Sequence, residues 1–143
     1  MKKQNRMKIN IKRLNDDFHM EAKNEDGVAI QMDSSPDIGG KNLGFRPMQM
    51  LLAAVGGCSS IDILLILKKQ KQIIDSFEVE VEGEKEKVEE HSIWKNVILH
   101  FKIKGEVDYD KAERAVKLSL EKYCSVSKTL EPTAKITYKL TVN

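Results

Sequence analysis

Neither sign of charge dominates this sequence. Its 24 lysines and arginines are nearly balanced by 22 aspartates and glutamates, which gives a formal net charge of +2. The lysines alternate with glutamates and do not form the basic patch that a nucleic-acid-binding surface requires. We therefore expect no nucleic-acid partner.

Cysteine is scarce. The chain has only Cys58 and Cys124, which are far apart and belong to no C-x-x-C motif. No histidine–cysteine spacing suits zinc, so we expect no metal and no other cofactor. A static disulfide is disfavoured in the cytoplasm. The two cysteines are therefore either buried, inert thiols or a reactive pair.

An uninterrupted hydrophobic run is also missing. The most apolar segment, residues 48–67, contains several polar residues, among them Asp62. A mid-span aspartate costs about 2.5–3.5 kcal/mol on membrane-insertion scales. The basic N-terminus leads into an alternating pattern and not into the apolar region of a signal peptide. We expect a cytoplasmic protein without a membrane span, in which residues 48–67 form a helix buried on most of its sides.

The first third of the chain alternates apolar and polar residues, which is typical of β-strands. Three short runs end near residues 11, 22 and 32, and the turn-forming sequences NDD and NEDG separate them. This pattern predicts an antiparallel meander of three strands. A Pro/Gly-rich loop, residues 34–47, then leads into the long helix, which we expect to end near Gln70.

The second half alternates again before a second helix. Residues 77–88 and 94–104 predict two strands, the latter with four inward residues: Val97, Leu99, Phe101 and Ile103. Residues 108–123 predict an amphipathic helix, with Asp110 and Glu113 at capping-box spacing and Tyr123 at the end of its apolar stripe. Residues 134–142 predict the last strand. The order β-β-β-α-β-β-α-β predicts one α+β domain over residues 1–143, with antiparallel sheets around a long central helix.

Two glycines precede the first cysteine in the middle of the long helix. Gly56 and Gly57 each cost about 1 kcal/mol relative to alanine in a helix interior. A missing Cβ allows another backbone, or a substrate, to approach closely. Close packing and a role in binding are both open at this point.

Cys58 also has an acidic neighbour. A cysteine nucleophile needs thiolate at neutral pH, and lowering a reference pKa of about 8.5 by roughly 2 units takes about 2.7 kcal/mol of anion stabilisation. Asp62, at i+4, lies on the same helical face, and a carboxylate there disfavours a thiolate. Either a cation neutralises Asp62, or Asp62 points across a subunit boundary, or Cys58 is not a thiolate.

Cys124 follows the second helix in the segment EKYCSVSKTLEP. If a short helix begins at Ser125, its free N–H groups favour a thiolate at Cys124. A small buried hydrophobic residue at the end of a helix explains the position equally well.

Two segments together carry a resemblance to a known family. They are GFRPMQMLLAAVGGCSSIDILLILKKQ and LSLEKYCSVSKTLEPTAKITYKL, each with its cysteine in register. With the order of elements from about residue 7 to 142, they resemble the OsmC/Ohr family of thiol-dependent peroxide-reducing proteins, on a less characterised OsmC-like branch.

The resemblance implies an OsmC-like fold in an intertwined homodimer, with the sites at the subunit interface. It implies a cysteine-based peroxidase in oxidative-stress defence. Cys58 would reduce an organic hydroperoxide and become a sulfenic acid, which Cys124 would capture as a disulfide. An external dithiol would then reduce the disulfide.

The activating residues of the hydroperoxide-resistance branch are missing. That branch has a glutamate ten positions before the reactive cysteine and an arginine in the first hairpin, where this sequence has Met48 and Phe18. Gln49 occupies the position where many OsmC-like proteins have glutamate. Of the nearest cations, Arg13 and Arg46, we favour Arg46, at the helix entrance. The candidate pocket or supporting residues are therefore Arg46, Met48, Gln49, Gly57 and Asp62.

The missing pair also allows a second function on the same fold. The protein would then be a non-catalytic module that binds a small hydrophobic ligand in the cleft at the dimer interface. Its cysteines would be packing residues or weak redox sensors. The rate and pH dependence of thiol alkylation separate the two functions.

Overall fold

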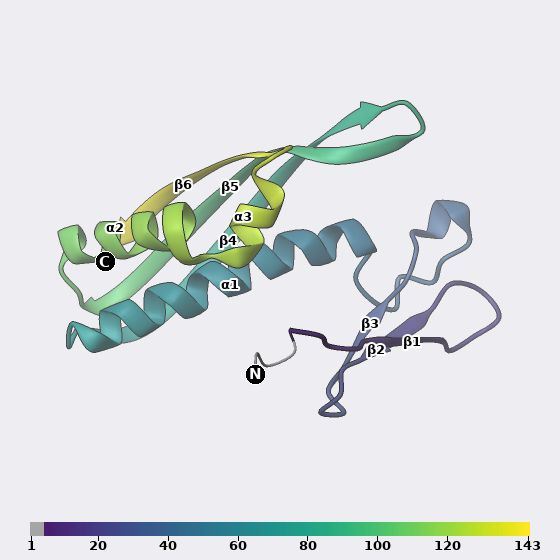
Figure 1. Cartoon of the computed structure of the whole chain (residues 1–143), viewed down its shortest axis with the longest axis horizontal. Coiled ribbons are helices and arrows are strands. Elements are labelled where there is room, and N and C mark those ends of the chain that lie inside the picture. The colour runs from purple at the N-terminus through teal and green to yellow at the C-terminus, as the bar shows by residue number, and fades with distance from the viewer. Residues whose placement is uncertain (1–4) are drawn as a thin grey trace. The chain divides into compact units, whose positions relative to one another are not determined.

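The computed structural model describes residues 5–143 and divides into two compact units, one ending at Met50 and one running from Leu51 to Asn143. Helix α1 (Pro47–Lys69) begins in the first unit and continues through the second. The order of the elements (Figure 1) confirms the predicted α+β class. That residues 1–143 form a single domain stays a prediction.

The first unit contains an antiparallel sheet of three strands, as predicted. β1 (Asn10–Arg13) pairs with β2 (Met20–Lys23), which pairs with β3 (Ala29–Met32). Asn15 and Asn24 shape the two connections, because the side-chain oxygen of each accepts backbone N–H groups two and four residues further on. Such turns, closed by an asparagine side chain, are the reason that NDD and NEDG separate the strands.

The unit does not bury its own apolar face. Ala22 is the one hydrophobic side chain of the unit that is buried among the described residues. Ile11, Phe18 and Ile30 are 55%, 43% and 46% exposed. The alternation therefore predicts the strands correctly, while the apolar face needs a cover from outside the unit.

Asp33 organises the loop from β3 to α1, which includes the single turn η1 (Pro36–Ile38). Its buried carboxylate accepts backbone N–H groups of Ser34, Lys41 and Leu43 at 2.7–3.1 Å. Burial alone would raise the pKa of Asp33, but the three hydrogen bonds stabilise the charged form and hold the pKa below its usual value. The Pro/Gly pattern predicts this loop but not its internal anchor.

The second unit is built on a sheet with the order β4-β5-β6. β4 (Ile73–Val88) and β5 (His91–Glu106) form a long antiparallel hairpin, and β6 (Lys135–Val142) pairs with β5 in parallel. The prediction of purely antiparallel sheets is wrong at this last pair. The segment between β5 and β6 is helical, and such a crossover brings the chain back to enter the sheet in the same direction.

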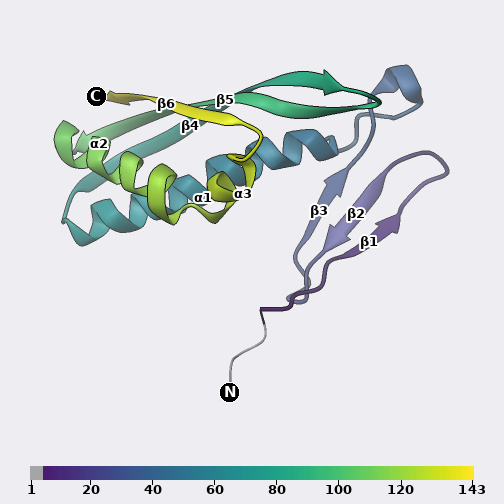
Figure 2. The same cartoon turned by 45° about the horizontal axis from the view of Figure 1, so that its top comes forward.

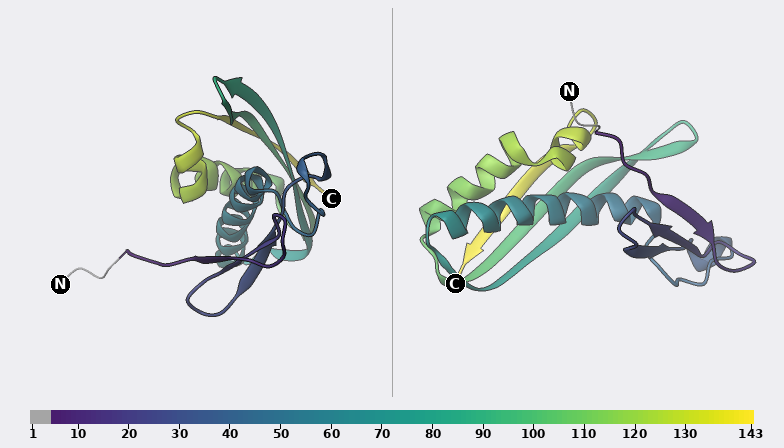
Figure 3. Two further views of the ribbon diagram at one scale, coloured as in Figure 1. Left: turned by 90° about the vertical axis from the view of Figure 1, so that its right-hand side faces the viewer. Right: turned by 60° about the horizontal axis from the view of Figure 1, so that its bottom comes forward.

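The helices of this unit lie on one face of its sheet (Figure 2 and Figure 3). The four residues predicted to point inward from β5 are at most 1% exposed and form the centre of the core: Val97, Leu99, Phe101 and Ile103. On β4, the alternate positions carry exposed glutamates: Glu78, Glu80, Glu82 and Glu84. The sheet therefore has one apolar face and one charged face.

Gly56 is explained by the close packing of α1 on β4. A Cβ at Gly56 would lie 2.8 Å from Cγ2 of Val81 and 3.7 Å from Cγ1 of Val79. Gly57 is exposed, and a Cβ there would meet nothing within 4 Å. Packing within the described chain therefore requires Gly56 but not Gly57.

The prediction that α1 is buried on most sides is wrong for the single chain. One stripe is buried: Val55, Gly56, Ser59, Ile63 and Leu67. On the other sides Ile61, Leu64 and Leu65 are 68%, 38% and 50% exposed. By length and composition α1 could cross a membrane, but its buried stripe identifies it as the core helix of this unit, and membrane insertion is not indicated.

The predicted second helix is divided. α2 (Tyr109–Leu118) continues into one π-helical turn, η2 (Ser119–Tyr123), and α3 (Ser125–Leu130) follows after Cys124. The π turn adds an extra residue to the helical repeat, so the apolar stripe ends at Leu120 and Tyr123 is 52% exposed. The expectation that Tyr123 continues the stripe is wrong for this reason.

The start of α2 also differs from the prediction. Asp108 is the N-cap, and its carboxylate accepts the backbone N–H of Lys111 at 3.0 Å. Asp110, expected to cap the helix, lies in its first turn. There its negative charge still complements the positive end of the helix dipole.

Candidate functional site

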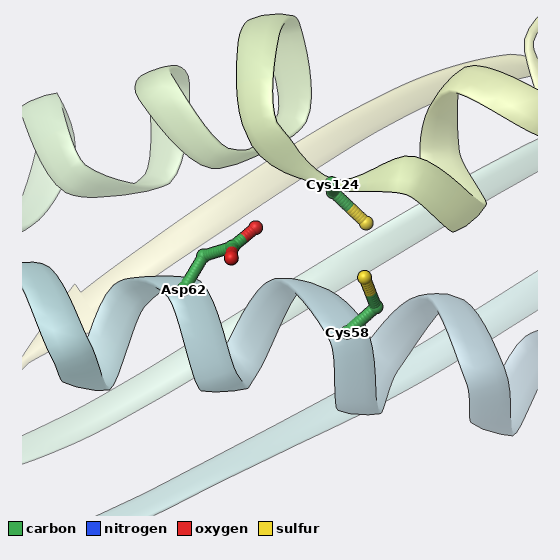
Figure 4. A group of neighbouring side chains, drawn as sticks. All are labelled: Cys58, Asp62 and Cys124. Atoms are coloured by element: carbon green, nitrogen blue, oxygen red, sulfur yellow. The ribbon is translucent and has the colours of Figure 1, made fainter. Parts of the chain in front are cut away.

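Cys58 and Cys124 lie close together in the second unit (Figure 4). Cys58 projects from α1, and Cys124 projects from the junction of η2 and α3. Both thiols are free, and their sulfur atoms lie within 4.8 Å of each other. A disulfide has an S–S distance of about 2.05 Å, so a bond between them needs a closure of less than about 3 Å.

The two thiols differ in their access to solvent. Cys124 is completely buried, whereas Cys58 is only half-buried. A molecule arriving from solvent therefore reaches the sulfur of Cys58 before that of Cys124.

Backbone hydrogen bonds hold Cys124 in place. Its N–H donates to the carbonyl of Ser119 at 2.7 Å, which closes the π turn. Its sulfur accepts the N–H of Ser127 at 3.3 Å, so that the side chain of Cys124 caps α3. A short helix does begin at Ser125, with the sulfur at its first turn.

The Cys124 thiol is nonetheless a poor acid, since its pKa is raised to about 11. Burial is the largest cause, the neighbouring Cys58 adds to it, and the N–H groups of Ser127 and Val126 oppose it. The N–H groups do favour a thiolate, as expected for a helix that begins at Ser125, but burial outweighs them. Cys124 is protonated at neutral pH.

Asp62 completes a group of three side chains. One of its carboxylate oxygens lies within 4.8 Å of both sulfurs, on the same side of α1 as Cys58 (Figure 4). The buried hydroxyl of Ser119 donates a hydrogen bond of 2.9 Å to Oδ2 of Asp62. Among residues 5–143, no lysine or arginine forms an ion pair with Asp62. Among the described residues its partner is a serine, and not the cation considered above.

Among the described residues, the same three side chains are the one group of Cys, His, Asp or Glu whose ligand atoms are close enough to share a metal ion. A closed structural zinc site uses four protein ligands, and this group offers three. The expectation of no metal and no other cofactor stays a prediction.

A surface cavity of about 420 Å³ borders Asp62. Leu65, Ile66, Lys69 and Tyr123 form the rest of its lining. Three of these four side chains are largely hydrocarbon, so the cavity suits a molecule with an apolar part.

Comparison with known proteins identifies the relatives of this chain. The family model described as OsmC-like protein matches residues 39–139, which include both cysteines. The chain belongs to the OsmC-like family. Protein YhfA of Escherichia coli K12 is 42% identical to this OsmC-like protein over 97 residues, which are 67% of this chain and 72% of YhfA.

Solved structures share the fold of this OsmC-like protein. A hypothetical protein from Aquifex aeolicus VF5 is 26% identical, with a TM-score of 0.80 over 98% of this chain and 99% of that one. The organic hydroperoxide resistance protein OhrB of Bacillus subtilis is 21% identical, with a TM-score of 0.67 over 95% of this chain and 98% of OhrB. At that identity, the likeness to OhrB shows the fold alone.

The residues considered in place of the missing activating pair have local structural tasks. Oε1 of Gln49 accepts the backbone N–H of Arg46 at 3.0 Å, which is half of a capping box at the start of α1. The guanidinium of Arg13 donates to the carbonyls of Asp16 and Asp17 in the first hairpin. The side chains of Arg46 and Gln49 therefore stay predicted, not demonstrated, members of a site.

The other predicted residues lie on α1. Met48 is half-buried in its first turn, and Gly57 is exposed directly before Cys58. Among the predicted residues, the structure thus brings together Cys58, Asp62 and Cys124.

Ser119 is the residue of the site that the sequence reasoning missed. It lies inside residues 108–123, the predicted amphipathic helix, at a position of the apolar stripe. A serine inside an apolar stripe is itself a signal, because a buried hydroxyl needs a hydrogen-bond partner. Ser119 is completely buried, and Asp62 is that partner.

Proposed function

We propose that this OsmC-like protein is a cysteine-based peroxidase that reduces organic hydroperoxides and closes a Cys58–Cys124 disulfide. The observation that carries the proposal is the separation of the two sulfur atoms, at most 4.8 Å. Membership of the OsmC-like family supports it, as does the fold shared with OhrB, a protein named for organic hydroperoxide resistance. The cellular role would be defence against oxidative stress in the cytoplasm.

The reaction proceeds in three balanced steps. The Cys58 thiolate attacks one peroxide oxygen of ROOH, the O–O bond breaks, and the alkoxide takes a proton and leaves as the alcohol. Cys58 is then a sulfenic acid, and Cys124 attacks its sulfur, so that water leaves and the disulfide forms. An external dithiol supplies two electrons and two protons, which restore both thiols.

Access to solvent supports the order of the two cysteines in this proposal. Half-buried Cys58 is the peroxide-reactive thiol, and buried, protonated Cys124 is the resolving thiol. A resolving thiol that does not ionise in advance avoids direct oxidation, because thiolate character and exposure determine susceptibility.

The cavity beside Asp62 supports a preference for organic hydroperoxides. Its lining by Leu65, Ile66 and Tyr123 offers apolar contacts that hydrogen peroxide cannot use. The exposed backbone at Gly57 leaves room next to the reactive sulfur.

A homodimer is part of the proposal. Ile61, Leu64 and Leu65 on α1 remain exposed in the single chain, and exposed apolar patches of this kind mark interaction surfaces. A second copy of α1 offers the matching apolar surface, in the intertwined arrangement that the family resemblance implies. Each copy would be a single OsmC-like domain over residues 1–143.

Peroxide consumption tests the function. We expect anaerobically reduced protein to consume cumene hydroperoxide with a dithiol reductant, faster than hydrogen peroxide, and Cys58→Ser to abolish turnover. Cys124→Ser should form the sulfenic acid at Cys58 but should not sustain turnover through the disulfide. Unchanged turnover in Cys58→Ser would reject the proposal.

Peroxide consumption also distinguishes the ligand-binding module, because that function predicts none. It further predicts slow and pH-insensitive alkylation of both thiols, and a hydrophobic molecule that co-purifies with the protein.

Light scattering on a sizing column tests the homodimer. The unmodified protein should have twice the mass of the chain, and Ile61→Glu should lower the mass to that of one chain. Thr137→Glu, on an exposed position of β6, is the matched control and should leave the dimer intact. A monomeric unmodified protein would contradict the homodimer.

A further inference from the structure

Asp62 has no task in the three steps above, yet it is held next to both sulfurs. The attack of Cys58 on the peroxide oxygen makes no use of this carboxylate. The buried hydroxyl of Ser119 nevertheless fixes this carboxylate in position by a hydrogen bond of 2.9 Å.

The second step creates the need that Asp62 can meet. Cys124 must lose its proton as it attacks the oxidised sulfur of Cys58. Because Cys124 is completely buried, this proton cannot pass directly to bulk water. The carboxylate of Asp62 lies within 4.8 Å of the Cys124 sulfur, a distance that one bridging water spans.

We propose that Asp62 is the proton acceptor for the Cys124 thiol in the step that closes the disulfide. This inference rests on the function proposed above and adds a catalytic residue to it. Asp62 receives the thiol proton while the S–S bond forms. It then returns the proton to the hydroxide that leaves the sulfur of Cys58, and the products are the disulfide and one water.

The other groups around Asp62 do not compete for this task. On α1 they are Cys58, which is the electrophile in this step, and Lys69, a cation in the lining of the same cavity. On the facing segment they are Cys124 itself, Ser119, which donates to Asp62, and Tyr123, which borders the cavity. Among the described residues that line this cavity or belong to the cluster of Cys58, Asp62 and Cys124, Asp62 is the one that carries a carboxylate.

The first test measures disulfide closure without peroxide. Cys58 of the full chain is converted to its mixed disulfide with thionitrobenzoate, and the release of the coloured thiolate reports the attack by Cys124. Asp62→Asn should slow the release by about 100-fold, the lower range for removal of a general base. Asp62→Glu should recover part of the rate, which a purely structural role does not predict.

The second test separates the two chemical steps during reaction with cumene hydroperoxide. The rate of sulfenic acid formation should not fall in Asp62→Asn, because Asp62 has no task in that step. The disappearance of the sulfenic acid should slow, so that a dimedone-type probe traps more of it. Damage to the fold would slow both steps together.

Asp75→Asn is the matched control, because Asp75 is an exposed aspartate on β4. It should leave both rates unchanged. Release of thionitrobenzoate from Asp62→Asn within twofold of the unmodified rate would overturn the inference. If the release slows as expected but no sulfenic acid forms with peroxide, the proposed peroxidase function fails while the role of Asp62 stands.

Discussion

Ser119 holds both halves of the thiol site through two different atoms. Its hydroxyl donates to Oδ2 of Asp62 at 2.9 Å, and its carbonyl accepts the N–H of Cys124 at 2.7 Å. The carbonyl bond is the one that closes the π turn η2. Insertions of this type in α-helices are frequent at functional sites. Here the π turn brings the helix of Ser119 to an end at Cys124, opposite α1.

Ser119→Ala should weaken the site without removing any group that reacts. The carbonyl bond to Cys124 remains, and the carboxylate of Asp62 can turn to solvent. We expect the free energy of unfolding to fall by about 1 kcal/mol, the typical net value of one hydrogen bond. Release of thionitrobenzoate should slow by less than in Asp62→Asn. A Ser119→Ala protein that is slower than Asp62→Asn would show that Ser119, and not Asp62, is the important group.

The two central glycines should respond oppositely to alanine. Gly56→Ala places a Cβ 2.8 Å from Cγ2 of Val81, and overpacking of this kind costs about 1–3 kcal/mol. Gly57→Ala meets nothing within 4 Å and should gain up to about 1 kcal/mol of helix stability. Urea unfolding measures both changes.

Gly57→Ala also tests the site. If room at this position serves a substrate or a second copy of the chain, peroxide turnover or dimer mass should fall while the stability of the fold rises. Unchanged turnover and mass in a stabilised Gly57→Ala protein would remove Gly57 from the candidate site residues.

The parts of the fold that follow from periodicity could be predicted from the sequence. The four inward residues of β5 are an example, because alternation alone assigns their face: Val97, Leu99, Phe101 and Ile103. The proximity of Cys58 to Asp62 follows equally from helical spacing. Proximity of Cys58 to Cys124 does not, since it depends on tertiary packing, and it entered only through the family resemblance.

Three features could not be predicted for stated physical reasons. The direction of β6 does not affect its alternation, so a parallel pair and an antiparallel pair have the same sequence pattern. The π turn breaks the 3.6-residue repeat on which the assignment of Tyr123 depended. The exposed side of α1 is apolar, and this pattern does not reveal whether the same chain or another chain covers that side.

Alkaline pH should destabilise the protein through Cys124. A cysteine in the unfolded chain has a pKa of about 8.5, and in the folded protein the pKa of Cys124 is raised to about 11. The resulting stabilisation is fully present below the unfolded pKa and is lost as the pH rises through the folded pKa. The free energy of unfolding, measured with urea under reducing conditions, should therefore fall between pH 8 and 11. It should fall more in the unmodified protein than in Cys124→Ser. Parallel curves for the two proteins would contradict this.

Gln49→Ala separates a capping role from a role in the site. Loss of the bond from its Oε1 to the N–H of Arg46 should cost about 0.5–1 kcal/mol of stability. Gln49→Glu keeps the reach of the side chain and should restore stability. If capping is the only role, the alkylation rate of Cys58 stays the same in both variants. A changed rate in the stable Gln49→Glu protein would support Gln49 as a supporting residue of the site.

Removal of the resolving thiol should leave Cys58 open to overoxidation. In Cys124→Ser, the sulfenic acid formed by peroxide has no thiol partner and should proceed to sulfinic and sulfonic acids. Serine is a good N-cap, so it can accept the N–H of Ser127 as the sulfur does, and the fold is retained. Cys124→Ala lacks this cap and should lose about 1 kcal/mol of stability, but its oxidation should be the same. Mass spectrometry of Cys58 after a peroxide series measures the result. Equal overoxidation in the unmodified protein and in both variants would mean that Cys124 does not protect Cys58, whatever the distance between the two sulfurs.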